Sequence, residues 1–341
     1  MPNLPDRISS VAELEEVLSR PGEELVAAMK RLNGDIMILG AGGKIGPTMA
    51  RTAQRAIQAA GTKKKVYAVD VVDLPALAAE GIQTLKCDMM DLKAVDALPK
   101  VENVIFMVGR KFGSTGSEEL TWAINVIVPY HVARSFTKSR IVAFSTGCVY
   151  PVAHVFSGGS TEDEAPDPVG EYAQSCLGRE RMFDYFSVHH GERVVQLRLD
   201  YAVEMRYGVL WDVATKVFNG QPVDVTTGFL NCMWQGDVCN QVLRALELAA
   251  SPATILNVTG PEILAVRDVA RRFGKLMGKQ PILAGQENGK GYLANAMKAN
   301  SIFGNPSVPV GKVMEWVAQW VKSGGESLGK PTHFETQDGK Y

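Results

Sequence analysis

The sequence predicts an α/β protein with a doubly wound parallel sheet and a smaller C-terminal domain. Four consecutive apolar residues, Ile36 to Leu39, lead into a glycine-rich turn, which is typical of a buried parallel strand followed by a helix. A second apolar run, 66–69, ends at an acid, Asp70. From residue 35 onward, strand-like runs alternate with helical patterns, as expected for a parallel sheet wrapped by helices.

The expected elements follow one another along the chain. The predicted strands cover residues 35–39, 66–70, 82–86, 103–108, 140–145, 194–199 and 254–258. The predicted helices cover residues 45–60, 119–137, 172–188, 236–249 and 265–278. The alternation weakens at 204–235 and beyond 280, where Gly, Pro and Asn are frequent. These segments indicate insertions above the carboxyl edge of the sheet, where ligands bind in open α/β folds.

The glycine-rich turn is suited to holding a phosphate. Its residues are Gly40, Gly42, Gly43, Lys44, Ile45 and Gly46. Three glycines have the spacing G-x-x-G-x-x-G, whereas the stricter G-x-G-x-x-G does not fit because Ile45 takes its last position. Backbone N–H groups and the following helix N-terminus would face the phosphate. A purely structural turn is the alternative, since glycine also serves tight βα connections.

Asp70 favours NAD as the ligand of this turn. It lies about 24 residues after Gly46, the spacing at which an acid meets the ribose hydroxyls of a dinucleotide. A carboxylate there would repel the additional phosphate of NADP. The alternative for Asp70 is a solvated strand end or a helix cap. The order of strand, turn, helix, strand and acid predicts a Rossmann-type NAD site.

These patterns divide the chain into three parts. Residues 1–34 precede the first strand and predict a helical extension that docks on the rest, beginning with a capping box at Ser10. We expect 35–204 to form the NAD-binding domain, its sheet completed by 231–260, and 205–341 to form mainly a substrate-binding domain. The polar tail 330–341 is expected to be an ordered strap across the substrate cleft rather than a frayed end.

Composition limits the classes of partner. The 341 residues carry a formal net charge of −1, which gives no electrostatic reason to expect nucleic acid or an anionic membrane. No apolar stretch reaches membrane-spanning length, and the acidic N-terminus differs from a signal peptide, so we expect a cytoplasmic protein. The five cysteines and five histidines lack ligand spacing, so neither a disulfide framework nor a metal site is predicted.

Further motifs along the chain together indicate a resemblance to one protein family. In chain order they are Cys87-Asp88-Met89-Met90-Asp91, Ile124-Asn125-Val126, Phe144-Ser145-Thr146-Gly147-Cys148-Val149-Tyr150, Tyr172, Gly236-Asp237-Val238 and Asn257-Val258-Thr259-Gly260. Tyr172 opens a helix 26 positions after Thr146. Together with the glycine turn, the chain resembles the extended short-chain dehydrogenase/reductase family, the NAD-dependent epimerase/dehydratase group, over roughly residues 35 to 320.

The resemblance implies roles for single residues at the cofactor. Asp88 would hydrogen-bond the adenine amino group, with Met89 packed beside the ring. Val108 and Gly109, at the end of the fourth strand, count among the cofactor-binding residues.

It also implies roles at the substrate. Thr146 would orient a substrate hydroxyl, Tyr172 would be its acid–base group, and Lys111 is a further candidate substrate contact. Hydride transfer at such a carbon needs a group that takes the hydroxyl proton from about 3 Å away. The family also pairs the helices around 119–137 and 172–188, which implies a homodimer.

The chain departs from the family at one position of its Tyr-x-x-x-Lys pattern. It has Tyr172-Ala173-Gln174-Ser175-Cys176, so a thiol replaces the ammonium that binds the nicotinamide ribose and lowers the pKa of the tyrosine. Bringing a phenol from about 10 to about 7 requires roughly 4 kcal/mol, which a neutral thiol cannot supply. Three explanations stay open. In the first, Arg179 or Lys111 substitutes for the lysine. In the second, Cys176 takes part as a catalytic thiolate. In the third, the protein has lost redox turnover and kept NAD binding.

Two other departures narrow the substrate. Dehydratases of the family carry Asp-Glu directly after the threonine, and Gly147 and Cys148 stand there instead. The stretch 230–235 lacks the arginine that contacts nucleotide diphosphates. We therefore expect an NAD-dependent oxidoreductase or epimerase acting on a small carbohydrate or sugar acid. The alternative is an NAD-binding protein of structural or regulatory role whose redox catalysis is lost or atypical.

Overall fold

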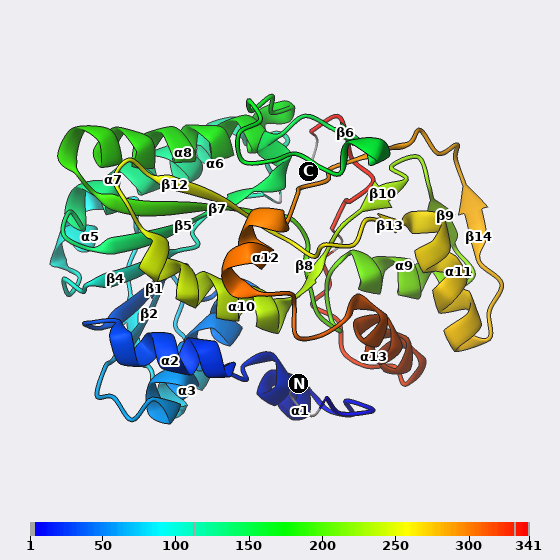
Figure 1. The fold of residues 1–341 in the computed structure, drawn as a ribbon, viewed down its shortest axis with the longest axis horizontal. Helices are drawn as coiled ribbons and strands as arrows, with labels where there is room; N and C mark the ends of the chain where they lie inside the picture. The colour runs from blue at the N-terminus through cyan, green and yellow to red at the C-terminus, as the bar shows by residue number, and fades with distance from the viewer. Residues whose placement is uncertain (1–3, 112, 331, 340–341) are drawn as a thin grey trace.

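A parallel sheet of seven strands forms the centre of the computed structural model, which describes residues 4–111, 113–330 and 332–339 (Figure 1). The strand order is β12-β7-β5-β4-β1-β2-β3, and every neighbouring pair is parallel. The strands are β1 (Ile36–Leu39), β2 (Val66–Asp70), β3 (Gln83–Lys86), β4 (Asn103–Phe106), β5 (Arg140–Thr146), β7 (Arg193–Leu199) and β12 (Thr254–Val258). The predicted Rossmann-type sheet is confirmed, and β1 and β4 flank its topological switch point.

Two layers of helices bury the sheet on both faces. One layer has α2 (Glu23–Arg31), α3 (Gly46–Ala59) and α10 (Gln235–Arg244), whose apolar residues share a core with one face of β1. The opposite layer has α5 (Leu92–Ala97), α7 (Val128–Ser135) and α8 (Gly170–His190). Figure 1 shows α7 and α8 above the sheet and α2 and α3 below it. Because helices cover both faces of the sheet, every residue of β1 and β4 is buried, and β1 is apolar throughout.

The helix expected over 119–137 is three pieces. They are α6 (Glu118–Trp122), a π-helical turn η1 (Ala123–Ile127) and α7. Pro129 has no backbone N–H, so it cannot donate to the carbonyl of Asn125 four residues earlier. Such π turns often mark functional positions, and Asn125 lies inside this one.

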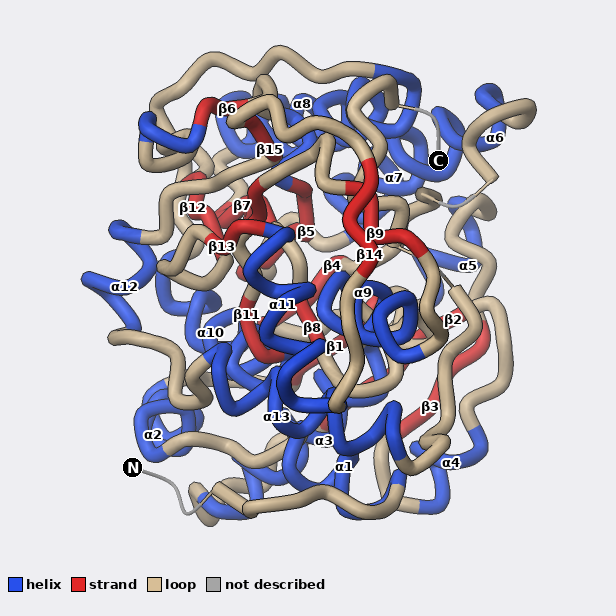
Figure 2. The backbone as a smooth tube through the Cα atoms, turned by 90° about the vertical axis from the view of Figure 1, so that its right-hand side faces the viewer, coloured by secondary structure: helices blue, strands red, loops and turns tan. Residues whose placement is uncertain are grey.

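The C-terminal part has its own apolar core. Its helices α9 (Val209–Phe218), α11 (Val266–Met277) and α13 (Val310–Lys322) pack together, beside the paired strands β9 (Pro222–Asp224) and β14 (Ile282–Ala284). Figure 2, seen from this side, shows α9 and α11 in front of the sheet. The sequence analysis did not predict α9 or α13.

The remaining elements are short. They are α4 (Pro75–Ala79), η2 (Gly147–Val149), β6 (Ala153–His154), η3 (Val155–Ser157), β8 (Ala202–Val203), β10 (Phe229–Leu230), β11 (Met233–Trp234), η4 (Ala245–Leu248), β13 (Leu264–Ala265), β15 (Lys290–Gly291) and α12 (Met297–Phe303). Within the described ranges, no helix is long and apolar enough to cross a membrane.

The N-terminal extension forms two helices that join both cores. In α1 (Val11–Leu18), the Ser10 side chain accepts a hydrogen bond from the N–H of Glu13 at 3.2 Å, as the capping box predicts. Leu14 of α1 lies in the C-terminal core, while Leu25 of α2 lies in the core beside the sheet. The extension therefore packs against both large parts of the molecule.

The C-terminal tail crosses the molecule as a strap, which is the arrangement the sequence analysis favoured. Thr332 donates from its N–H and its hydroxyl to Asp212 of α9, at 2.8 and 2.5 Å. Phe334 is buried, and Gly339 lies against Gly170 at the start of α8. Pro331, Lys340 and Tyr341 of the expected strap lie outside the described residues, as does Phe112.

Candidate active site

A cavity of about 870 Å³ opens at the carboxyl edge of the sheet. The glycine turn, the ends of β4, β5 and β7, the segment before α9 and the strap all contribute to its walls. This is the place at which ligands bind in doubly wound sheets.

The glycine turn is shaped for close approach. Gly40 has a φ of +88°, and a Cβ atom there would meet the backbone of Met107 at 3.0 Å. A Cβ on Gly46 would lie 2.3 Å from the carbonyl oxygen of Ala41, so the turn closes only with glycine there. The Asp70 carboxylate accepts a hydrogen bond from the N–H of Gly42 at 2.8 Å. The turn thus brings open backbone and the acid of β2 together, as a dinucleotide requires.

The predicted cofactor residues divide into two groups. Those that line the cavity are Gly40, Gly42, Gly43, Lys44, Ile45 and Gly109. Asp88 is exposed at the end of β3, where its carboxylate accepts from the N–H of Met90 at 2.9 Å. Met89 is only 4 % exposed and lies in the core, and Val108 packs partly buried against that core. The structure therefore does not bring Met89 or Val108 to the cavity wall.

Tyr172 and Thr146 meet at the floor of the cavity. Thr146 ends β5, and Tyr172 lies in the first turn of α8. The Tyr172 hydroxyl hydrogen-bonds with the Thr146 side chain and with the thiol of Cys176. Burial raises the pKa of the Tyr172 phenol well above its usual value, and it also raises the pKa of Cys176. At neutral pH both groups keep their protons.

Arg179 supplies a buried positive charge beside this pair. It is 6 % exposed and donates to the carbonyl oxygen of Phe144 and to the Oδ1 of Asn125, each at 2.8 Å. Its charge lowers the pKa of Tyr172 and of Cys176, although burial outweighs it in both. The Asn125 amide in the π turn also bonds both backbone groups of Arg110 and the hydroxyl of Ser175. The π turn thereby fixes Arg179 next to the loop that follows β4.

Three lysines from separate segments gather around the cavity. Lys111 lies 5.7 Å from the ring centre of Tyr172 and donates to the carbonyl oxygen of Thr332. Lys44 lies with its Nζ 3.3 Å from the ring centre of Tyr207. Burial, and then the charges of Lys330 and Lys111, lower the pKa of Lys44 to about 7. This arrangement favours an anion, because a negative charge would relieve the repulsion.

The N-terminal extension reaches the cavity through Glu15, which the sequence analysis missed. Glu15 of α1 pairs with Arg51 of α3 and with Arg206, each at 2.8 Å. Arg51 also pairs with Glu80, and Arg206 with the buried Glu204. No spacing in the sequence marks this network, because its members come from four distant segments.

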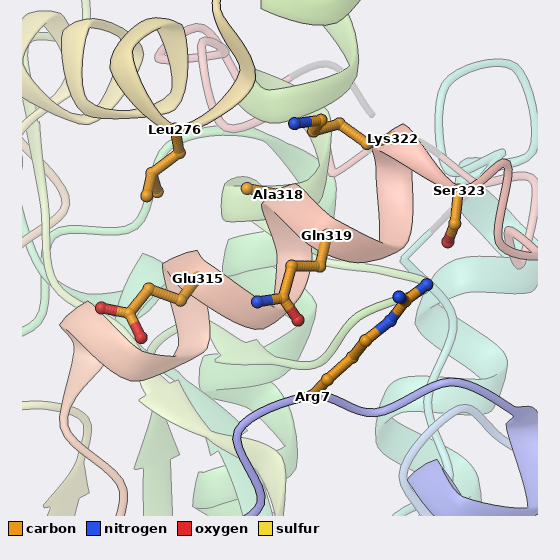
Figure 3. A pocket seen from close by; sticks show the side chains of 7 residues that line it. All are labelled: Arg7, Leu276, Glu315, Ala318, Gln319, Lys322 and Ser323. Carbon is orange, nitrogen blue, oxygen red and sulfur yellow. The ribbon is translucent and has the colours of Figure 1, made fainter.

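A second hollow, of about 520 Å³, lies beside α13 (Figure 3). Its walls are Arg7, Leu276, Glu315, Ala318, Gln319, Lys322 and Ser323. It contains none of the predicted site residues, so we do not consider it the active site.

Comparison with protein families identifies the chain. Residues 36–203, from the start of β1 to the end of β8, match the model described as the NAD dependent epimerase/dehydratase family. This segment of the chain belongs to the family. NAD is the cofactor of the epimerase/dehydratase family, and the glycine turn with Asp70 fits that cofactor.

Solved structures share the fold of most of the chain. MoeE5 in complex with UDP-glucuronic acid and NAD aligns with a TM-score of 0.70 and 20% identity, over 85% of this chain and 99% of that one. UDP-glucose 4-epimerase of Thermotoga maritima aligns with a TM-score of 0.69 and 16% identity, over 85% and 99%. The Thermus thermophilus enzyme of the same name, in complex with NAD, aligns with a TM-score of 0.68 and 18% identity, over 84% of this chain and 99% of that one. Curated protein sequences gave no match.

Proposed function

We propose that this protein is an NAD-dependent oxidoreductase or epimerase that acts on a small sugar acid by hydride transfer at a hydroxyl-bearing carbon. The observation that carries the proposal is the Thr146–Tyr172 pair, which shares one cavity with the glycine turn. A dinucleotide on the turn and a polyhydroxy substrate at this pair would then lie in the same space.

The chain's own residues have distinct parts in this proposal. Gly40, Gly42 and Gly43 would hold the pyrophosphate, and Asp70 would bind the adenosine ribose. When bound, NAD accepts or returns a hydride. Thr146 and Tyr172 hydrogen-bond the substrate oxygen, and Tyr172 exchanges a proton with it. Epimerisation adds only a turn of the ketone before the hydride returns.

Arg179 is the cation that we propose in place of the family lysine. It lies one helical turn beyond Cys176, and it acts on the pKa values of both Cys176 and Tyr172. The raised pKa of Cys176 favours a neutral thiol over a thiolate. We therefore propose that Cys176 contributes by hydrogen-bonding Tyr172 and holding its ring in place.

The lysines favour an acid over a neutral sugar. Lys111 lies beside the ring of Tyr172, so a substrate whose hydroxyl meets Tyr172 would bring a nearby carboxylate within reach of it. Lys330 of the strap adds charge to the same cavity. Charge-assisted hydrogen bonds from lysine to carboxylate are stronger than neutral ones.

A substrate screen tests the proposal. Purified protein is incubated with NAD and with matched pairs of aldoses and their acids, and the appearance of NADH is followed by absorbance. We expect turnover of at least one acid, and at least a tenfold lower rate for Tyr172→Phe. Equal rates in the two proteins would remove Tyr172 from the mechanism.

A second candidate function is an NAD-holding protein without turnover. The raised pKa of Tyr172 and the absence of lysine at position 176 support it. Cys176→Lys separates the two candidates. If hydride transfer appears only in this variant, the natural site is degenerate. If the variant loses an existing activity, the thiol environment belongs to a working site.

We further propose that the protein is a homodimer. Six exposed apolar side chains lie on α6, η1, α7 and α8: Leu120, Trp122, Ile127, Tyr130, Tyr185 and Val188. In the described structure, α7 and α8 pack side by side, so these residues share one helical layer. A second copy of this layer would cover them as a four-helix interface.

A further inference from the structure

Asp200 is a carboxyl group of the cleft that has no part in the function proposed above. It directly follows β7, and the register pairs the preceding Leu199 with Thr146. Asp200 therefore lies beside Gly147, one residue beyond the threonine that holds the substrate oxygen. A Cβ atom on Gly147 would lie 3.2 Å from the Asp200 Cγ and 3.5 Å from its Oδ1. Because residue 147 is a glycine, the Asp200 carboxyl has room at the cavity wall.

The surroundings of Asp200 favour its protonated form. It is 4 % exposed and lines the cavity, and within the described part of the chain its Oδ2 has no hydrogen-bond partner. Burial raises the pKa of Asp200 well above its usual value, while the charge of Lys111 acts in the opposite direction. A protonated carboxyl that lacks a partner and faces a ligand cavity can donate to a ligand oxygen.

The backbone around Asp200 is held in an unusual conformation. Tyr201, the next residue, has a φ of +44°, in the left-handed region that side chains other than glycine rarely adopt. The N–H of Asp200 donates to Val258, and the N–H of Met233 donates to Tyr201, at 3.1 and 3.0 Å. Backbone strain of this kind collects at functional sites, where the surrounding structure enforces it.

We propose that Asp200 is a further catalytic residue, which gives its proton to the substrate carbonyl oxygen in the reduction direction. This inference rests on the proposed function. As the carbonyl carbon gains the hydride of NADH, its π electron pair moves to oxygen. The O–H bond of Asp200 breaks, a new O–H bond forms on the substrate, and the Asp200 carboxylate is left facing Lys111. Oxidation of the alcohol runs these steps in reverse and starts from the Asp200 carboxylate, which accepts the hydroxyl proton.

Asp200 suits this step better than Tyr172 does. Asp200 is buried and Tyr172 is half-buried, and burial raises the pKa of both groups. A carboxylic acid is ordinarily about six pKa units more acidic than a phenol. In the reduction direction Tyr172 then donates a hydrogen bond and orients the oxygen, and Asp200 takes over the proton exchange that the proposed function gives to Tyr172.

Two substitutions test the proposal. Asp200→Asn keeps the shape and a hydrogen-bond donor but cannot give up a proton, so we expect kcat for ketone reduction to fall about 100-fold or more, with KM changed less. Asp200→Ala should lose the same activity, and added formate should restore part of it. Both variants should bind NAD with wild-type affinity, which shows that they are folded. Wild-type kcat in Asp200→Asn, or no effect of formate on Asp200→Ala, would overturn the proposal.

Glu192→Gln is the matched control. Glu192 is also a buried carboxyl, and burial raises its pKa to about 7, but it lies in the turn between α8 and β7, outside the cavity wall. We expect the Glu192→Gln variant to have the wild-type kcat, and added formate should not change it.

Infrared spectroscopy gives a readout that does not depend on turnover. Wild-type protein at neutral pH should show the C=O band of a protonated carboxylic acid, and Asp200→Asn should lack its share of that band. The charged and titratable groups that face Asp200 are Lys111, Tyr201 and Cys232. Because Lys111 lowers the pKa of Asp200, Lys111→Met should move the loss of the band to higher pH. An unchanged band in Asp200→Asn would contradict the protonated state.

The two proposals fail in different ways. If wild-type protein reduces no keto acid or ketose with NADH, the proposed function and this role of Asp200 both fall. If wild-type protein turns over and Asp200→Asn equals it, only the role of Asp200 falls.

Discussion

At the scale of single residues, the site depends on how burial and charge oppose each other. Burial raises the pKa values of Tyr172, Cys176 and Asp200 and so favours the protonated form of each group. Arg179 and Lys111 act against that shift. The lysine that the family places at position 176 would have added one more positive charge. The positive charges that act on these groups here are Arg179, farther along α8, and Lys111, in the loop after β4.

We expect Asp70 to set the preference for NAD over NADP. Asp70→Asn retains an oxygen that can accept from Gly42 but removes the negative charge. At contact distance in a water-like medium, the repulsion of one added phosphate charge is about 1 kcal/mol, or about fivefold in affinity. We therefore expect the preference for NAD over NADP, measured by calorimetry, to fall by about that factor. Asp96→Asn on α5 is the control, and a preference unchanged in Asp70→Asn would contradict this role.

The lowered pKa of Lys44 predicts that the protein takes up protons when it binds an anion. Its pKa is lowered to about 7, so at pH 8 most of it is neutral. A pyrophosphate near the glycine turn favours the charged form and raises that pKa, so the protein should take up a fraction of a proton when NAD binds at pH 8. Below about pH 6 the lysine is already charged and the uptake should vanish. Calorimetry in buffers of different ionisation enthalpy measures the uptake, which Lys44→Met should abolish.

At the scale of elements, the predicted strands were found because buried parallel strands are apolar throughout, as β1 is. The interruption of 119–137 by a π turn depends on Pro129, whose position was visible but whose effect was not foreseen. Helices α9 and α13 were missed because Gly, Pro and Asn surround them, although their own sequences are amphipathic. Asp200 and Glu15 could not be predicted as neighbours of the site, since only the tertiary packing brings them there.

Helix α1 is predicted to be a structural part of the domain core. Leu14 is fully buried in the core of the C-terminal part, so Leu14→Ala should lower the free energy of unfolding by about 2 to 5 kcal/mol. Glu23→Gln, at an exposed position in α2, is the control and should change it by less than about 0.5 kcal/mol. Denaturant unfolding provides the measurement. Equal stabilities of the two variants would show that α1 is not part of the core.

At the scale of the whole molecule, the extension and the strap hold two packed cores around one cavity. Glu15 joins α3 to Arg206 on one side, and the strap joins Asp212 to the start of α8 on the other. The cavity is therefore formed by segments from both ends of the chain. Its lining follows from the topology, since the neighbouring strands β5 and β7 end side by side at the carboxyl edge of the sheet.

The helical layer of α6, α7 and α8 predicts the state of assembly. Val188 is 59 % exposed on α8, and Val188→Asp would place a charge in the proposed interface. We expect light scattering at micromolar concentration to show a dimer for the wild type and a monomer for this variant. Met297→Asp, at an exposed position of α12, should remain a dimer. A wild-type monomer would contradict the proposal.

The central claim is that the turn from Gly40 to Gly46 holds a dinucleotide against the Thr146–Tyr172 pair. Calorimetric titration of the purified protein with NAD tests it most directly, alongside Gly43→Leu, whose side chain would fill the cradle. The account predicts saturable binding of one NAD per chain to the wild type and at least a tenfold weaker affinity in the variant. No measurable affinity in the wild type, or equal affinity in both proteins, would contradict it.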